Sequence, residues 1–204
     1  MLPLAVLRLR GLGPTSFNGF KPDLVRLINS RSFTSVVDDD TRRSILTLIA
    51  RGSTKASEIA SKLHLTRTSI YRYLKSLYRA GFICKRRGHF FIASRLFLVY
   101  DVVVDDQGSL LIKINQSVGG IVDEDAGFIV IREHSCHCGI CAIREECLSS
   151  LKRLAKKLDV KIRSESPLEA FKEIVKTVVT RDIVELAKRG YLVLKIPELD
   201  EERE

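Results

Sequence analysis

Apolar residues recur every three to four positions along three segments in the first half of the chain, which predicts amphipathic helices. The first helix is expected to begin at the acidic run 38–40, whose charges suit a helix N-terminus, and to close at Gly52. A short helix is expected over Lys55–Leu63. The third is expected over Arg67–Ala80, with Thr66 as its N-cap.

Two short β-prone runs follow the third helix, at Phe82–Lys85 and His89–Ala93. The tight turn between them contains Gly88 and predicts a β-hairpin. A helix, a short helix, a turn, a third helix and a hairpin form the element order of a winged helix-turn-helix.

The second half alternates strand-like runs with turns and then returns to helical spacing. Strands are expected at Leu96–Val104, Leu110–Ile114, Val118–Val122, which contains the pair Gly119-Gly120, and Phe128–Arg132. A helix is expected over Ala142–Leu158, with Cys147 on its apolar stripe. The remaining expected elements are a strand-like Val160–Ile162, a helix from Pro167 to Arg189 opened by a capping box at Ser166 and Glu169, and a strand at Tyr191–Ile196.

These elements predict an α+β protein, in which an N-terminal winged helix-turn-helix is followed by a small α+β domain with a four-cysteine metal site. The expected divisions are an N-terminal extension and helix (1–37), the winged helix-turn-helix (38–95), the cysteine-cluster domain (96–198) and an acidic tail (199–204).

Charge changes the picture, because the net charge of +9 is concentrated in one region. Residues 38–95 hold thirteen Lys and Arg against four Asp and Glu, whereas residues 96–204 hold more acids than bases. A basic block of this kind is the electrostatic footprint of a polyanionic partner. A solvated lysine- and arginine-rich surface is the plainer alternative.

The segment from Ser57 to Ile83, SEIASKLHLTRTSIYRYLKSLYRAGFI, resembles the ArsR-like and TrmB-like winged helix-turn-helix transcriptional regulators that are common in archaea. The resemblance covers roughly residues 38–93 and implies that the third helix enters the major groove of double-stranded DNA. The residues it assigns to bases or phosphates on that helix are Arg67, Thr68, Ser69, Tyr71 and Arg72, with Lys75 on the same outward side. On the wing it assigns Arg86, Arg87 and His89 to the DNA backbone or minor groove.

Winged helices also dock on proteins, so a contact with RNA polymerase or a partner subunit stays open. Tyrosines at helical spacing are usually core residues, and Tyr71, Tyr73 and Tyr78 are expected to be partly buried.

Four of the five cysteines fall within twelve residues, in the run SCHCGICAIREEC. They are Cys136, Cys138, Cys141 and Cys147, spaced C-x-C-x2-C-x5-C. Thiols this close together would form strained disulfides, whereas Cys-x-x-Cys turns converge sulfurs on a metal. The predicted centre is a [4Fe–4S] cluster, and one Zn2+ is the alternative.

The ending C-x2-C-x5-C resembles the cluster loops of endonuclease III-type glycosylases, WhiB regulators and the archaeal initiation factor TFE-beta. This resemblance implies an iron–sulfur cluster, with Cys136 as the upstream ligand. One residue separates Cys136 from Cys138, a tighter spacing than in those families, so His134 or His137 stays open as the fourth ligand.

No run of about 18 apolar residues is present, and the N-terminus lacks the features of a signal peptide. We therefore expect a soluble cytoplasmic protein that does not contact membranes, in which thiols stay reduced. No catalytic constellation of nuclease or glycosylase type is visible, so we expect no enzymatic activity. The leading hypothesis is a DNA-binding regulator, with a second copy of the chain as a candidate partner, whose cluster senses redox state or stabilises the fold. The alternative is a TFE-beta-type initiation factor that contacts RNA polymerase.

Overall fold

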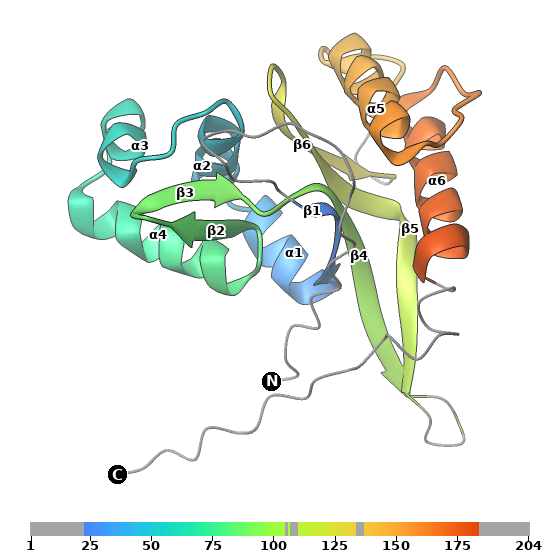
Figure 1. The fold of residues 1–204 in the computed structure, drawn as a ribbon, viewed down its shortest axis with the longest axis horizontal. Coiled ribbons are helices and arrows are strands. Elements are labelled where there is room, and N and C mark those ends of the chain that lie inside the picture. Colours follow the sequence, from blue (N-terminus) through green and yellow to red (C-terminus); the bar gives the residue numbers. More distant parts are fainter. Residues whose placement is uncertain (1–22, 105, 107–109, 134–136, 184–204) are drawn as a thin grey trace.

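A four-stranded sheet separates two layers of helices in the computed structural model, which describes residues 23–104, 106, 110–133 and 137–183 (Figure 1). The strand order is β1-β4-β5-β6. The winged helix lies against one face, and helices α5 and α6 lie against the other (Figure 1). The strands of the sheet are β1 (Asp23–Asn29), β4 (Ser94–Val104), β5 (Leu110–Asp123) and β6 (Gly127–Arg132).

The winged helix is inserted between the first two strands of this sheet. Strand β1 pairs in parallel with β4, and parallel neighbours need a long crossover connection. Here the whole winged helix supplies that connection. It consists of α1 (Ser30–Val37), α2 (Asp40–Ala50), α3 (Ala56–Lys62), α4 (Arg67–Arg79), and the hairpin β2 (Ile83–Arg86) and β3 (His89–Ile92).

Alternation along the central strand gives each face of the sheet its own core, because successive side chains of a strand point to opposite faces. Phe97 and Val99 of β4 belong to the core shared with the winged helix. Leu96 and Leu98 belong to the core beneath α5 (Arg144–Leu158) and α6 (Pro167–Val178). Because both faces of β4 are buried, the strand reads in sequence as a continuous apolar run.

A buried arginine adds a polar link between the sheet and the winged helix. Arg26 of β1 donates a hydrogen bond of 2.8 Å to the carbonyl of Gly81, just beyond α4. It also forms an ion pair with Asp23 at 2.7 Å. The cation lies at the C-terminal end of α4, where the helix dipole favours positive charge.

Strand β5 is continuous from Leu110 to Asp123, whereas two separate strands, Leu110–Ile114 and Val118–Val122, were predicted. A Cβ atom on Gly119 would lie 2.4 Å from the ring of Phe171, and one on Gly120 would lie 2.7 Å from the ring of Phe128. The two glycines therefore leave room for the Phe171 ring of α6 on one face of the sheet and for the Phe128 ring of β6 on the other. The register between β4 and β5 shifts beside these glycines, because Leu98 pairs with Gly119 whereas the next residue, Val99, pairs with Asn115.

Three local predictions after the sheet were wrong. The expected strand Val160–Ile162 has no strand structure. Ser166 occupies the N-cap of α6, but its side chain makes no capping hydrogen bond. The long helix predicted to Arg189 is α-helical only to Val178, where a π-helical turn, η1 (Val179–Ile183), follows.

The last six residues of that predicted helix, the predicted strand Tyr191–Ile196 and the acidic tail lie outside the described residues. Among the helices in the described part of the chain, none has the length and apolarity needed to cross a membrane.

Candidate nucleic-acid interface

Helix α4 docks on the winged helix through one apolar stripe and turns its polar side outward. Ile70, Leu74 and Leu77 are buried on the inner side. A helix turns once in about 3.6 residues, so the opposite positions form a second stripe. That exposed stripe consists of Thr68, Arg72, Lys75 and Arg79.

The start of α4 is fixed by its predicted N-cap. The hydroxyl of Thr66 accepts a hydrogen bond of 3.2 Å from the backbone N–H of Ser69. Capping in this way leaves the first turn of the helix, with Arg67 and Thr68, exposed. The positive end of the helix dipole and a guanidinium thus lie together, an arrangement that favours anionic oxygens.

The wing holds two arginines beside α4 on a tight turn. Arg86 pairs with His89 across the hairpin, and the turn residues Arg87 and Gly88 have φ angles of 48° and 81°. Two positive φ angles match the twist of the flanking strands. The ring of His89 anchors the wing to the loop before α3, since its Nδ1 lies 2.8 Å from Oγ1 of Thr54.

A groove of about 720 Å3 lies between α3, the first half of α4 and the wing. Its walls include four of the predicted contact residues, Arg67, Tyr71, Arg87 and His89. Thr68, Arg72 and Lys75 lie on the outward stripe of α4, and Arg86 is exposed on the wing. Ser69 is half-buried and does not lie on the outward stripe. Together with Arg72 it lines a separate hollow on the far flank of α4, whose other residues are Asp39, Arg42 and Tyr73.

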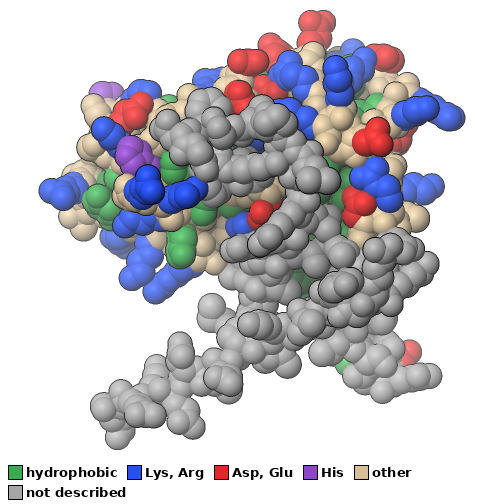
Figure 2. Space-filling view, viewed as in Figure 1, with side chains coloured by type: hydrophobic (Ala, Val, Ile, Leu, Met, Phe, Trp, Pro, Cys, Tyr) green, Lys and Arg blue, Asp and Glu red, His purple; other side chains and the backbone are tan. Residues whose placement is uncertain are grey.

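The surface formed by α4 and the wing is free of acidic residues. The sequence contains no Asp or Glu between Glu58 and Asp101, yet the same stretch holds nine Lys and Arg. Figure 2 shows Lys and Arg side chains gathered over the winged helix. Two of these nine, Lys62 and Arg95, form ion pairs with Glu58 and Glu124. The other seven lie on α4 and the wing, which contain no acid, so this surface carries a positive potential suited to phosphates.

Sequence reasoning missed one cation and misplaced two tyrosines. Lys55, the first residue of the predicted helix Lys55–Leu63 and the N-cap of α3, lines the groove, and nothing in the sequence indicated this. Tyr71 and Tyr78 were expected to be partly core, but they are 45% and 55% exposed. Only Tyr73 of the three packs against the core.

A family comparison matches this part of the chain. Residues 39–85 match the model of the bacterial regulatory protein, arsR family. The match runs from the N-cap of α2 into β2, and so contains the helix-turn-helix and the start of the wing. It supports a winged-helix regulator, and it does not extend to β4–β6 or to α5 and α6. A search of curated proteins found no significant match.

The described part of the cysteine loop leads into α5, which packs on the face of the sheet opposite to the winged helix. Cys138 is half-buried, Cys141 is exposed, and Cys147 is buried in the first turns of α5. Its burial with Leu151 confirms the predicted apolar stripe. Cys136 lies outside the described residues.

Within the described ranges, no three Cys, His, Asp or Glu side chains are grouped as metal ligands would be. The described geometry therefore does not assemble the predicted four-cysteine site, which stays a prediction from the spacing.

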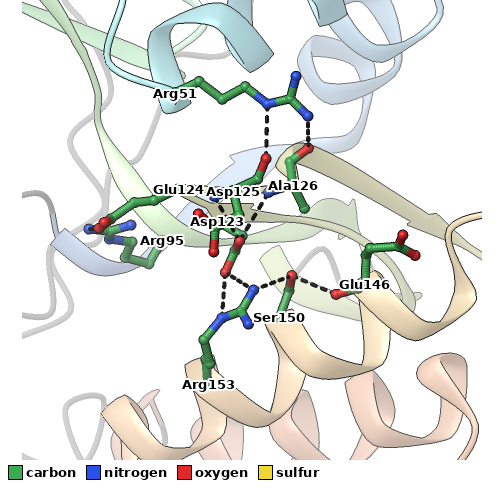
Figure 3. Close-up of polar contacts among 9 residues, drawn as sticks. All are labelled: Arg51, Arg95, Asp123, Glu124, Asp125, Ala126, Glu146, Ser150 and Arg153. Atoms are coloured by element: carbon green, nitrogen blue, oxygen red, sulfur yellow. Dashed lines mark hydrogen bonds and ion pairs between the residues drawn. The ribbon is translucent and has the colours of Figure 1, made fainter.

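The turn between β5 and β6 makes polar contacts with both α5 and the end of α2 in the winged helix (Figure 3). Asp123 accepts hydrogen bonds from the backbone N–H groups of Asp125 and Ala126 and forms an ion pair with Arg153 of α5 at 2.7 Å. From the other side, Arg51 at the end of α2 donates to the carbonyls of Asp125 and Ala126, at 3.0 and 3.4 Å. A shift of α5 would therefore move this turn and, through the contacts with Arg51, change the position of α2.

The same contacts hold Asp123 in its ionised form. Burial alone would raise the pKa of this carboxyl, but the hydrogen bonds from the Ala126 N–H, from Arg153 and from the Asp125 N–H outweigh it. The pKa is thus lowered from its ordinary value of 3.8. The stabilisation is complete above this ordinary value and is lost as the pH falls through the lower value of the folded state.

Replacing Asp123 with asparagine is expected to lower the free energy of unfolding at pH 7 by about 1–3 kcal/mol, since the Arg153 pair and one anionic acceptor are lost. The difference from the wild type should shrink as the pH falls below about 4, where the wild-type carboxylate is also neutralised. Urea unfolding of both proteins between pH 7 and pH 3 measures this. A difference that stays constant over the series would show that the charge of Asp123 contributes nothing.

Proposed function

We propose that this protein is a transcriptional regulator that binds double-stranded DNA through α4 and the wing. The observation that carries the proposal is the acid-free, cationic surface that α4 and the wing form within the segment matching the arsR family. In this arrangement the outward stripe of α4 reads the major groove, with Arg72 and Lys75 facing the base edges and phosphates. The arginines of the wing hold the neighbouring backbone.

Selection from a random duplex library tests whether the full chain reads a sequence. Enrichment of one sequence is expected, because side chains on a groove-bound helix distinguish base edges. An inverted repeat in that sequence would indicate that two copies bind together, as predicted for a homodimer. No enrichment, together with co-purification of RNA polymerase, would contradict a regulator and favour a basal initiation factor.

We further propose that the C-terminal half holds a metal centre on the thiolates of Cys136, Cys138, Cys141 and Cys147, with a [4Fe–4S] cluster favoured over Zn2+ by the spacing. Two consecutive turns support it, since Ile140 donates to the carbonyl of His137 and Arg144 donates to that of Cys141. These turns hold Cys138 and Cys141 in one short loop that leads into α5, where Cys147 lies.

The packing of this loop also supports a metal centre. Ile140 is 88% exposed and Ile143 is 50% exposed, so the described part of the loop lacks an apolar core of its own. Loops of this kind are commonly held by metal coordination, which supplies folding free energy. When bound, a cluster would supply redox sensitivity. A change in the loop would then move α5, and the contacts of the Asp123 turn would pass this movement on to α2.

Metal analysis of anaerobically purified protein tests the site. We expect about four irons per chain for a cluster, or one zinc for a structural site. Cys141→Ser should lower the metal content, whereas Cys84→Ser, on the wing, should leave it unchanged. Wild-type protein without stoichiometric iron or zinc would contradict the metal centre, whatever its affinity for DNA.

A further inference from the structure

A second groove lies on the other side of the wing, and aromatic rings form part of its walls. Its volume is about 550 Å3, within the range of about 300–1,000 Å3 that is usual for ligand pockets. One wall is the flank of α4 that faces the wing, and the other is the hairpin. The lining residues are Tyr71, Leu74, Lys75, Tyr78, Lys85, Arg87, Gly88 and Phe90.

The two tyrosines of this groove lie seven residues apart on the same flank of α4. They are separated by about 10.5 Å along the helix axis, with Lys75 between them. About half of the surface of each tyrosine is exposed to solvent. Exposing two such rings leaves apolar surface in water, a cost that a ligand stacking on them would remove.

Cations alternate with these rings. The Nζ atom of Lys85 lies 5.7 Å from the centroid of the Phe90 ring, and Phe90 forms a buried floor. Lys75 and Arg87 stand at the same groove. Among the described residues that line it, none is acidic. The groove thus offers positive charge and aromatic faces within one short span.

Duplex DNA cannot stack on these aromatic rings, because the faces of its bases are stacked on one another and only base edges and phosphates are accessible. Unpaired nucleotides present both a phosphate and a free base face, which cations and aromatic rings bind in turn. We propose that this groove binds single-stranded nucleic acid, with bases stacking on Tyr71 and Tyr78 and phosphates contacting Lys75, Lys85 and Arg87. This activity goes beyond the proposed binding of duplex DNA.

The test compares Tyr78→Leu with Tyr78→Phe in the full chain. Leucine keeps an apolar side chain but removes the ring, whereas phenylalanine keeps the ring and removes only the hydroxyl. The probes are fluorescein-labelled oligodeoxythymidine, which forms no duplex, a labelled duplex of random sequence, and labelled oligoglutamate as an acidic polymer. Circular dichroism spectra of the variants establish that both are folded.

Tyr78→Leu is expected to weaken oligothymidine binding about 10-fold or more, because stacking of one base contributes roughly 1–3 kcal/mol, while Tyr78→Phe stays near the wild type. Duplex binding should be unchanged in both variants. The chain has no tryptophan, so its emission comes from its five tyrosines, two of which line the groove. Oligothymidine should quench this emission in the wild type, and less in Tyr78→Leu.

Several results would overturn the proposal. One is oligothymidine binding that is absent or that Tyr78→Leu does not weaken. Another is an equal loss of affinity for the single strand and for the duplex in Tyr78→Leu. A third is an affinity for oligoglutamate equal to that for oligothymidine, which would assign the groove to acidic polymers in general. Duplex binding is followed separately, so failure of the regulator proposal would show as lost duplex affinity with single-strand binding retained.

Discussion

Replacing Arg67 and Arg72 together with alanine is expected to weaken the binding of the full chain to duplex DNA by about 100-fold. Both guanidinium groups are exposed on α4, and in the described part of the chain neither forms an ion pair that would hold it away from DNA. Each lost contact to a base or phosphate costs roughly 1–1.5 kcal/mol, and about 1.4 kcal/mol corresponds to a factor of ten.

Fluorescence anisotropy with the selected duplex, at constant salt, measures this loss. The matched control is Lys156→Ala with Lys157→Ala, which removes the same charge from exposed positions on α5. Because α5 lies across the sheet from α4, the control should stay within about two-fold of the wild type, as expected for weak, screened long-range effects. Equal losses in the two double variants would mean that only net charge matters and that α4 is not the binding surface.

Phe82→Ala is expected to lower the free energy of unfolding by about 3–5 kcal/mol, a large part of the stability of a typical domain. Phe82 is fully buried between the winged helix and the sheet. Its ring centroid lies 5.9 Å from that of Phe33, 5.1 Å from Phe97 and 5.8 Å from Phe128. Removing the ring leaves a cavity in the core that the winged helix and the sheet share.

Because the winged helix and the sheet share this core, the variant should unfold in one cooperative transition, at a lower urea concentration than the wild type. Urea unfolding followed by circular dichroism and by tyrosine emission tests it, since the emission comes from tyrosines of both parts, Tyr71, Tyr73 and Tyr78 on α4 and Tyr100 on β4. Ile140→Ala, at a position that is 88% exposed, is the control and should change stability by less than about 0.5 kcal/mol. Separate transitions for the two probes would contradict a winged helix built into the sheet.

The local chemistry of the winged helix made it predictable from the sequence. Helical spacing located α2, α3 and α4 to within about two residues, and Thr66 caps α4 as expected. The glycine of the Arg87-Gly88 turn identified the hairpin. All these signals act between residues that are close in sequence, so they survive folding into almost any tertiary context.

The non-local features could not be predicted. The pairing of β1 with β4 joins residues about 70 apart, and nothing in the short apolar run of Asp23–Asn29 specifies its partner. The role of the glycine pair 119–120, which lies within the predicted strand Val118–Val122, was not foreseen, because a sequence does not show that Phe171 and Phe128 will approach the backbone. The spacing of the cysteines predicted a ligand set, but only three of the four lie within the described residues.

The dependence of DNA affinity on salt concentration tests whether α4 and the wing bind the DNA backbone. The affinity of the full chain for duplex DNA is to be measured between about 50 and 200 mM salt. If about five cations contact phosphates, the logarithm of the association constant should fall with the logarithm of salt with a slope of roughly −4.5, and the Arg67 and Arg72 double variant should lose up to about two units of slope. A slope near zero, or one unchanged in the double variant, would contradict the claim.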